Sequence, residues 1–397
     1  MNIAIFFSSS LESGGAHQYE YMVLNILKKY HKNESIKLKF YLFNNKLQKK
    51  FSNSDINYNI VKENIFQKKH RISLSNSFFH KIFSKIRMSL CSIERKLLCD
   101  KIDLVYFLSP SSIPQALNNI PYIFTLWDLG HLEELEFPEV SNNGIFESRE
   151  LMYTKSLKKA FKVIVDSKYL KQYATNKYNL DEKRVEILKF LPNNRVTDNE
   201  DIIDIKKMYN IKNDYIFYPA QFWAHKNHIY ILKAIKILRE KKNIDIDVVF
   251  SGSDRGNLAY ILNKAKQFGV DDLIHYVGFV PNNQIPYLYK QSLSLVMPTY
   301  LGPTNIPPLE AFFYKTPVCY SDKPSFREQV RDAVFYIDLK DPHSLVETII
   351  KIKNNKELVN YKIHKGMEIL SSWSEEDFYK CLITMFEEYQ YIREGWE

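Results

Sequence analysis

The sequence has few cysteines and no long apolar run. Its four cysteines, Cys91, Cys99, Cys319 and Cys381, are too few and too scattered for a disulfide framework, which favours a reducing cytosol. No stretch of about 18 apolar residues is present, so we expect no membrane-spanning helix. Residues 3–7 are apolar but lack a basic start, which argues against a signal peptide and favours a first strand.

Length and composition predict a globular protein with two domains. The chain has 397 residues, of which 45% are apolar and 25% charged, a mix that excludes disordered and fibrous classes. Single hydrophobic cores stop growing at roughly 250–300 residues, so two cores are expected. A chain of this size buries enough surface to fold without a metal or a disulfide.

Positive charge is concentrated in residues 46–101, which hold 13 Lys or Arg against four Asp or Glu. This difference of nine equals the net charge of the whole chain, +9. A basic surface suits an anionic partner, either a membrane face or a polyanion, while a plain solvated face stays open. Apolar residues typical of an interfacial helix, or equally of an ordinary packed helix with a solvated side, recur at Phe78, Phe79, Ile82, Phe83, Ile86 and Met88. We therefore predict a cytoplasmic protein resting on the inner face of the cell membrane.

Short apolar strands alternate with helical patterns along the chain. Strands are predicted at residues 3–7, 103–108, 122–126, 163–165, 215–218, 248–250, 295–297 and 318–320. Apolar strands separated by helices favour parallel sheets covered on both faces, an α/β fold. The strand, loop and helix of residues 1–30 recur at 214–240, which predicts two doubly wound domains joined by a polar hinge at 192–199.

Two loops after predicted strands carry groups suited to an anionic ligand. Gly14 and Gly15 precede the first helix, where backbone N–H groups favour anions, although a tight turn explains them equally well. Lys226 lies near a later helix start and is a point charge suited to a diphosphate, although a lone lysine is more commonly a plain surface residue. His225 and His228 flank it without any Cys or acidic cluster, so zinc is not expected.

An Asp-x-Asp pair is present but poorly placed for a metal. Asp245 and Asp247 stand at the start of the strand at 248–250, the wrong end for a ligand site in a parallel sheet. We expect both carboxylates to be solvated at the strand edge.

Residues 297–312 hold the strongest functional signal. A strand ends, a loop follows and prolines open a helix, with Glu310 expected in the first turn. A carboxylate offers only acceptors, so it suits a vicinal diol such as a ribose. Free N–H groups at Thr304, Asn305 and Ile306 are expected to receive phosphate oxygens.

Together these motifs resemble a retaining glycosyltransferase of the GT-B fold, in the large family four (glycosyl transferases group 1). Motifs in the family's order cover nearly the whole chain: Ser13-Gly14-Gly15, Ala220-x5-Lys226-Asn227, Ser251-Gly252-Ser253-Asp254, Val277-Gly278-Phe279-Val280, Pro307-Pro308-Leu309-Glu310-Ala311 and Ser372-Trp373-Ser374. The resemblance implies two Rossmann-like domains facing a central cleft. It implies an acceptor domain at 1–195, a nucleotide-sugar donor domain at 196–375 and a C-terminal helix at 376–397 that packs back towards the first domain.

The resemblance also implies an activity and its residues. Lys226 is implied to bind the donor diphosphate, Glu310 the donor ribose, and Asp128 to match the family's His-Asp segment. The remaining implied donor-binding residues are Gly14, Gly15, His17, Gln221, His225, Gly252, Val280, Thr304, Asn305 and Ile306. The implied reaction moves a sugar from a nucleotide diphosphate sugar to a hydroxyl acceptor with retention. It would serve cell-surface polysaccharide assembly on a lipid-linked saccharide, with no metal or other cofactor.

Three positions depart from the family's pattern. The first glutamate of Glu-x7-Glu would fall at Gly302, the arginine five residues before the lysine is Gln221, and the histidine of His-Asp is Trp127. All three surround the transferred sugar and its diphosphate. Either the donor differs, or other side chains compensate, or activity is lost; the candidates for compensation are Thr304, Asn305, His17 and His225.

Other classes of function remain open. A sugar-nucleotide 2-epimerase of the same fold would need no acceptor, and a non-catalytic nucleotide-sugar-binding protein would show no turnover. A nucleic-acid partner is not expected, although the pI is near 9.0, because the basic excess lies away from the ligand loops and no nucleic-acid motif is visible.

Overall fold

The computed structural model describes residues 1–7, 14–42, 57–74, 90–192, 203–302 and 304–396. These residues form two compact units. The first unit comprises Met1–Asp128, Gly144–Lys189 and Glu375–Glu397, and the second comprises Leu129–Asn143 and Phe190–Ser374. Residues 129–143, assigned by sequence to the first domain, thus belong to the second unit. The predicted hinge at 192–199 lies, apart from Pro192, outside the described residues.

The first unit is built on a parallel sheet with the strand order β3-β2-β1-β4-β5-β6-β7. The strands are β1 (Asn2–Phe7), β2 (Lys37–Leu42), β3 (Tyr58–Ile60), β4 (Leu104–Phe107), β5 (Tyr122–Thr125), β6 (Lys162–Val165) and β7 (Val185–Ile187). Residues 3–6 of the inner strand β1 are fully buried, as expected for a continuous apolar strand between two helical layers.

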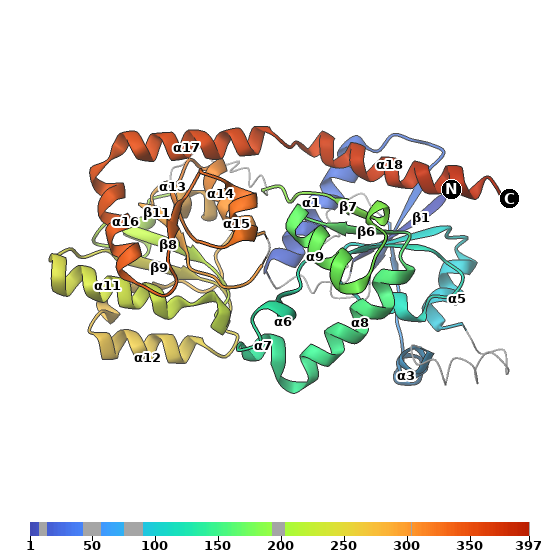
Figure 1. Ribbon diagram of the computed structural model, residues 1–397, viewed down its shortest axis with the longest axis horizontal. Helices are drawn as coiled ribbons and strands as arrows, with labels where there is room; N and C mark the ends of the chain where they lie inside the picture. Colours follow the sequence, from blue (N-terminus) through green and yellow to red (C-terminus); the bar gives the residue numbers. More distant parts are fainter. Residues whose placement is uncertain (8–13, 43–56, 75–89, 193–202, 303, 397) are drawn as a thin grey trace. The chain divides into compact units, whose positions relative to one another are not determined.

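Helices connect and cover these strands (Figure 1). The main ones are α1 (Gly14–Tyr30), α3 (Ile65–Leu74), α5 (Ser92–Cys99), α8 (Ile145–Lys159), α9 (Lys168–Tyr178) and α18 (Glu375–Arg393). The C-terminal helix α18 packs against α1, where Glu375 pairs with Lys29 at 2.8 Å and Phe378 meets the Tyr19 ring. The amphipathic run predicted at 78–88 lies outside the described residues.

The second unit has a parallel sheet in the order β10-β9-β8-β11-β12-β13. Its strands are β8 (Tyr215–Pro219), β9 (Asp247–Ser251), β10 (Ile274–Tyr276), β11 (Ser294–Met297), β12 (Val318–Ser321) and β13 (Phe335–Ile337). Both sheets therefore confirm the predicted doubly wound α/β class, and every strand predicted from sequence is present.

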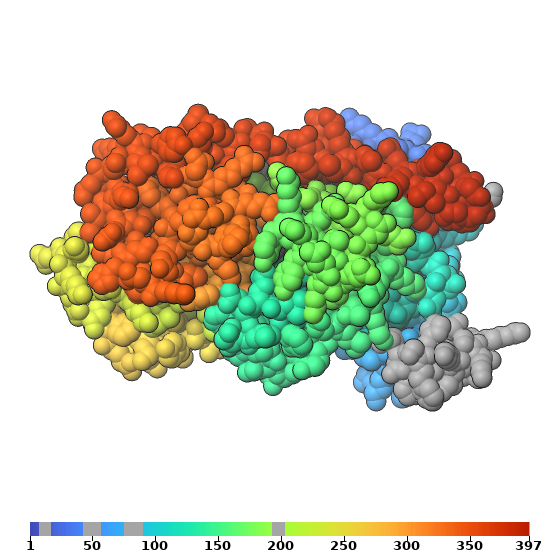
Figure 2. Space-filling model, in the orientation of Figure 1, coloured from blue at the N-terminus to red at the C-terminus, as the bar shows by residue number. Residues whose placement is uncertain are grey.

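Helices also cover the second sheet. They include α11 (His228–Lys242), α12 (Leu258–Phe268), α13 (Ile285–Lys290), α14 (Ile306–Phe313), α15 (Pro324–Val330), α16 (His343–Asn354) and α17 (Lys356–Ser371). Helix α11 packs against α12 and α16, while α14 packs against α17. The space-filling view shows the red-orange atoms of α16 and α17 at the surface of this unit (Figure 2). Across the described ranges, every helix is too short or too polar to traverse a bilayer.

Each sheet has one point where the strand order reverses, beside β1 in the first unit and beside β8 in the second. In open parallel sheets, ligands bind at the carboxyl ends of the strands next to such a point. In the second unit the relevant loops follow β8 and β11, and these are the loops that carry Lys226 and lead to Glu310.

Candidate functional site

The loops after β8 and β11 are hydrogen-bonded to each other. The backbone N–H of Tyr300 donates to the carbonyl oxygen of His225 at 2.9 Å. The buried Tyr218, at the end of β8, donates its hydroxyl to the carbonyl of Lys226 at 2.8 Å. These bonds fix the backbone of His225 and Lys226 at the point where the strand order reverses. The structure thus brings His225, Lys226 and residues 299–302 together.

A short 3₁₀ turn, η4 (Ala224–Lys226), carries both cationic candidates. It ends at Asn227, whose left-handed backbone (φ 55°) redirects the chain into α11. His228 opens α11 fully buried and stacks on Phe222 at 4.2 Å. Burial, with the nearby charge of Lys226, lowers the pKa of His228 to about 3. His228 is therefore neutral near pH 7, and the neighbouring Lys226 supplies a fixed positive charge.

Glu310 lies on α14 and is only 3% exposed. Its Oε2 accepts a 2.9 Å hydrogen bond from the hydroxyl of Tyr289 on α13, a partner that sequence patterns did not reveal. The helix begins at Ile306, so Glu310 lies beyond the first turn, and the predicted benefit of a first-turn charge is wrong. The hydroxyl of the buried Tyr289 helps to hold the carboxylate.

The loop before α14 has an unusual backbone. Gly302 has φ 106°, a value that side-chain-bearing residues rarely adopt, and a Cβ there would lie 3.1 Å from the Asn305 side chain. The missing first glutamate therefore coincides with a backbone that only glycine adopts easily. The N–H of Asn305 donates to Gln329 at 3.1 Å, and its side chain donates to Tyr320 at 2.7 Å. The prediction of a free N–H is consequently wrong for Asn305.

The ends of β8 and β9 approach closely through Gly252. Its φ is 139°, and a Cβ would lie 2.4 Å from the carbonyl oxygen of Ala220. Nearby, Gln221 accepts a 3.0 Å hydrogen bond from the indole of Trp223, and Val280 is buried beside the exposed Phe279. Backbone contact at Gly252 therefore sets the distance between the loop after β9 and the loop after β8 that carries Gln221.

Residues 129–143 contribute side chains to this site that the sequence analysis missed. The segment contains α6 (Gly130–Glu133) and α7 (Pro138–Ser141). Glu139 contacts His225, Phe137 packs on the rings of His225 and Tyr300, and Glu134 pairs with Lys323. No sequence pattern pointed to these contacts, because Glu139 and His225 are 86 positions apart.

The first unit holds candidate residues of its own. Asp128, after β5, accepts a 2.5 Å hydrogen bond from Arg149 of α8, which also contacts Tyr153. Gly14 and Gly15 are the first residues of α1, and His17 lies one turn further. At the end of β4, Ser109 donates to the buried Glu20.

Asp245 and Asp247 have structural roles. Asp247 is 2% exposed and accepts hydrogen bonds from the backbone of Lys212 and Asn213, so the expected solvation is wrong for this residue. Asp245 pairs with Arg239 at 2.8 Å. Within the described ranges, no group of three or more His, Cys, Asp or Glu side chains is arranged to hold a metal ion.

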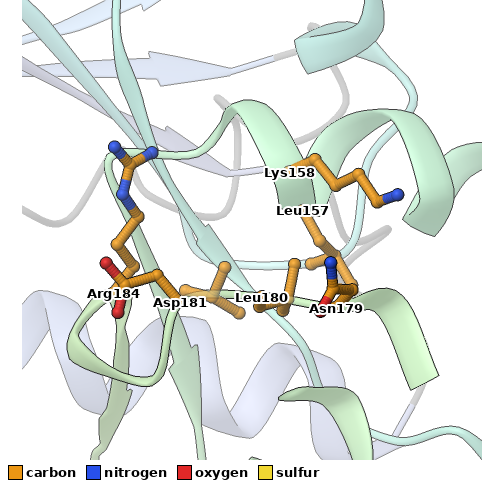
Figure 3. A pocket seen from close by; sticks show the side chains of 7 residues that line it. Leu157, Lys158, Asn179, Leu180, Asp181 and Arg184 are labelled. Atoms are coloured by element: carbon orange, nitrogen blue, oxygen red, sulfur yellow. The ribbon is translucent and has the colours of Figure 1, made fainter. Parts of the chain in front are cut away.

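A surface hollow of about 300 Å³ lies elsewhere in the first unit (Figure 3). Leu157, Leu180 and the charged Lys158, Asp181 and Arg184 line it. It sits where α8 ends and β6 and β7 begin, the opposite end of the sheet from the carboxyl ends of the strands. None of the candidate site residues borders it.

Solved structures of low sequence identity share this fold. One of them is HepE from Anabaena, which was solved in complex with UDP and with UDP-glucose. The UDP complex matches this chain with a TM-score of 0.71 at 13% sequence identity. The match covers 98% of this chain and 99% of HepE. The two parallel-sheet units and such neighbours define the GT-B class of folds.

Sequence comparisons point to one family of glycosyltransferases. Residues 200–368 match the family described as Glycosyl transferases group 1. The O-antigen chain mannosyltransferase RfbU of Salmonella typhimurium is 24% identical over 233 residues, covering 56% of this chain and 61% of its own length. The O-antigen chain mannosyltransferase B of Escherichia coli is 28% identical over 138 residues, covering 34% of this chain and 36% of its own. The chain thus spans about six tenths or less of these relatives, and the matches support a glycosyltransferase of this group.

Proposed function

We propose that the protein transfers a sugar from a nucleotide diphosphate sugar to a hydroxyl acceptor, with retention, in polysaccharide assembly on a lipid-linked saccharide. The observation that carries this proposal is the hydrogen bond between the loop that holds Lys226 and the loop that leads to Glu310 on α14, at the point where the strand order of the second sheet reverses. UDP and UDP-glucose in HepE and the mannosyltransferase activity of the relatives support a nucleotide-sugar donor.

In this proposal each group has one chemical task. Lys226 stabilises the negative charge that develops on the departing diphosphate, which is the costly event of the reaction. Glu310, oriented by Tyr289, accepts hydrogen bonds from the ribose hydroxyls. Asp128, held by Arg149, lies at the carboxyl end of β5 in the first unit, where the acceptor would bind. No metal and no covalent nucleophile is invoked.

Product analysis with nucleotide sugars tests the reaction itself. We expect donor consumption only when a saccharide acceptor is present, with the anomeric configuration of the donor kept in the product as read by NMR. A changed sugar isomer formed without acceptor would identify a 2-epimerase. Nucleotide binding without any turnover would identify a non-catalytic nucleotide-sugar-binding protein. Gly302, in place of the first glutamate of the family's motif, is the specific reason for this alternative.

We also propose that α3 contacts an anionic membrane. Its buried face holds Arg71 and Leu74, whereas Ile65, Phe66 and Ile72 are 72%, 83% and 55% exposed. Lys62, Lys68 and Lys69 are also exposed on or beside this helix. Exposed apolar side chains flanked by lysines are typical of an interfacial helix.

Vesicle flotation tests the membrane proposal. Wild-type protein should float with vesicles containing anionic lipid and detach as salt rises, because each basic residue contributes about 1 kcal/mol near such a surface. Replacing Ile65 and Phe66 with serine should reduce the floated fraction. Tyr391→Ser, which removes another exposed aromatic ring of the first unit, should leave it unchanged. Equal flotation of all three proteins would contradict the role of α3.

A further inference from the structure

Two acidic side chains attach the 129–143 segment to the loops of the second unit's site. Glu139 binds His225, and Glu134 pairs with Lys323, which also donates to the carbonyl of Tyr300 at 2.6 Å. Both pairs belong to one segment and one unit, yet only Glu139 touches the residue that precedes Lys226.

Glu139 makes two contacts with the same histidine. Its Oε1 accepts from the backbone N–H of His225 at 2.8 Å and lies 2.5 Å from the ring Nδ1. The two side chains are only 6% and 13% exposed. Burial raises the pKa of the Glu139 carboxyl, but hydrogen bonds from the ring and backbone of His225 outweigh this effect and leave the pKa lowered. The carboxylate is therefore ionised near pH 7, and the proton of the pair resides on Nδ1.

An ionised carboxylate on Nδ1 determines what the rest of the ring does. It fixes the orientation of the imidazole with Nδ1 as the donor to the carboxylate, and in the imidazolium form Nε2 is a second donor. The centroids of the Phe137 ring and the imidazole lie 6.2 Å apart in an edge-to-face arrangement, and the Tyr300 N–H donates to the His225 carbonyl. Contacts with Glu139, Phe137 and Tyr300 thus hold the backbone and the ring of His225.

We propose that Glu139 is a positioning residue that holds His225 as a second cationic donor to the donor diphosphate, beside Lys226. The inference rests on the proposed nucleotide-sugar function. It accounts for Gln221, since the hydrogen-bond donor that an arginine would supply at that position comes here from Nε2 of the imidazole that Glu139 holds. Sequence comparison alone does not pair these residues, because Glu139 arrives from a segment 86 residues away.

The test compares diphosphate with monophosphate binding. UDP, GDP, UMP and GMP are titrated calorimetrically into the full-length chain and its variants. Glu139→Gln should weaken binding of the preferred nucleoside diphosphate by about tenfold, which is the value of one charge-assisted hydrogen bond. It should leave the affinity for the corresponding monophosphate within about twofold of the wild-type value. Glu134→Gln is the matched control: it removes the other attachment of the same segment and should leave the diphosphate-to-monophosphate ratio unchanged.

A double-mutant cycle separates positioning from folding. If Glu139 acts through His225, Glu139→Gln should have no further effect on diphosphate affinity in a His225→Ala background. His225→Asn keeps an amide near the Nδ1 position but lacks Nε2, so it should lose diphosphate affinity while still bonding Glu139. It tests the proposal even if Glu139→Gln does not fold.

Three results would overturn the inference. The first is an equal effect of Glu139→Gln and Glu134→Gln on the diphosphate-to-monophosphate affinity ratio. The others are additive effects of Glu139→Gln and His225→Ala on diphosphate affinity, or wild-type diphosphate affinity in His225→Asn. Lys226→Ala distinguishes a failure of the proposed function from a failure of the inference about Glu139. If it leaves diphosphate affinity intact, the proposed function falls and takes the inference with it. If it weakens diphosphate while Glu139→Gln and His225→Asn do not, only the inference falls.

Discussion

Replacing Lys226 with alanine should lower the turnover number by about 10²–10³-fold, which corresponds to a loss of roughly 3–4 kcal/mol of transition-state stabilisation. The lysine backbone is held by Tyr218 and the adjoining His225 by Tyr300, so the side chain is presented from a rigid turn. A positive charge held in place stabilises the leaving diphosphate without reorganisation during the reaction. Steady-state kinetics with the best donor and acceptor measure the change.

Two further variants show whether this loss is specific. Lys264→Ala removes a lysine of α12 that contacts Gln267 on the helix surface, and it should leave turnover unchanged. Glu310→Gln keeps the size of the side chain and an acceptor for Tyr289, and should weaken nucleotide affinity through the ribose. If Lys226→Ala retained wild-type turnover, the assignment of the diphosphate site to the loop after β8 would be wrong.

Gly252→Ala should lower the free energy of unfolding of the second unit by about 3 kcal/mol. The alanine Cβ would lie 2.4 Å from the Ala220 carbonyl oxygen and 2.9 Å from the Gln221 nitrogen, both of them backbone atoms. The backbone at φ 139° adds its own strain. Since neither neighbour is the end of a flexible side chain, β8 and β9 would have to separate. Chemical denaturation followed by fluorescence measures the loss.

Gly256→Ala is the matched control for this prediction. Gly256 belongs to the same loop and also has a positive φ, 98°, but a Cβ there meets nothing within 4 Å. Its substitution should lower the free energy of unfolding by roughly 1 kcal/mol, the cost of placing an alanine in this backbone conformation. Equal destabilisation by the two alanines would mean that backbone conformation, and not the close approach of Ala220, makes glycine necessary at 252.

Local patterns predicted the fold because they report burial directly. Continuous apolar strands such as residues 3–7 and 215–218 are those of a parallel sheet covered on both faces, and all of the predicted strands are present. The positions of Lys226 and Glu310 after strands of one sheet were equally predictable, since the carboxyl ends of parallel strands share one edge. The prediction that Asp247 is solvated was wrong because its position at a strand start did not reveal the backbone N–H groups that it binds.

The amino-acid order alone therefore determined the doubly wound class, the recurrence of one plan in two halves and the loops that follow the carboxyl ends of the strands. These follow from short-range periodicity and from turn chemistry, which depend on neighbours in the chain. Folding in three dimensions decided the remainder: that residues 129–143 join the second unit, that Glu139 meets His225, and that Tyr289 holds Glu310. Such contacts depend on where distant segments pack, and no local pattern records that choice.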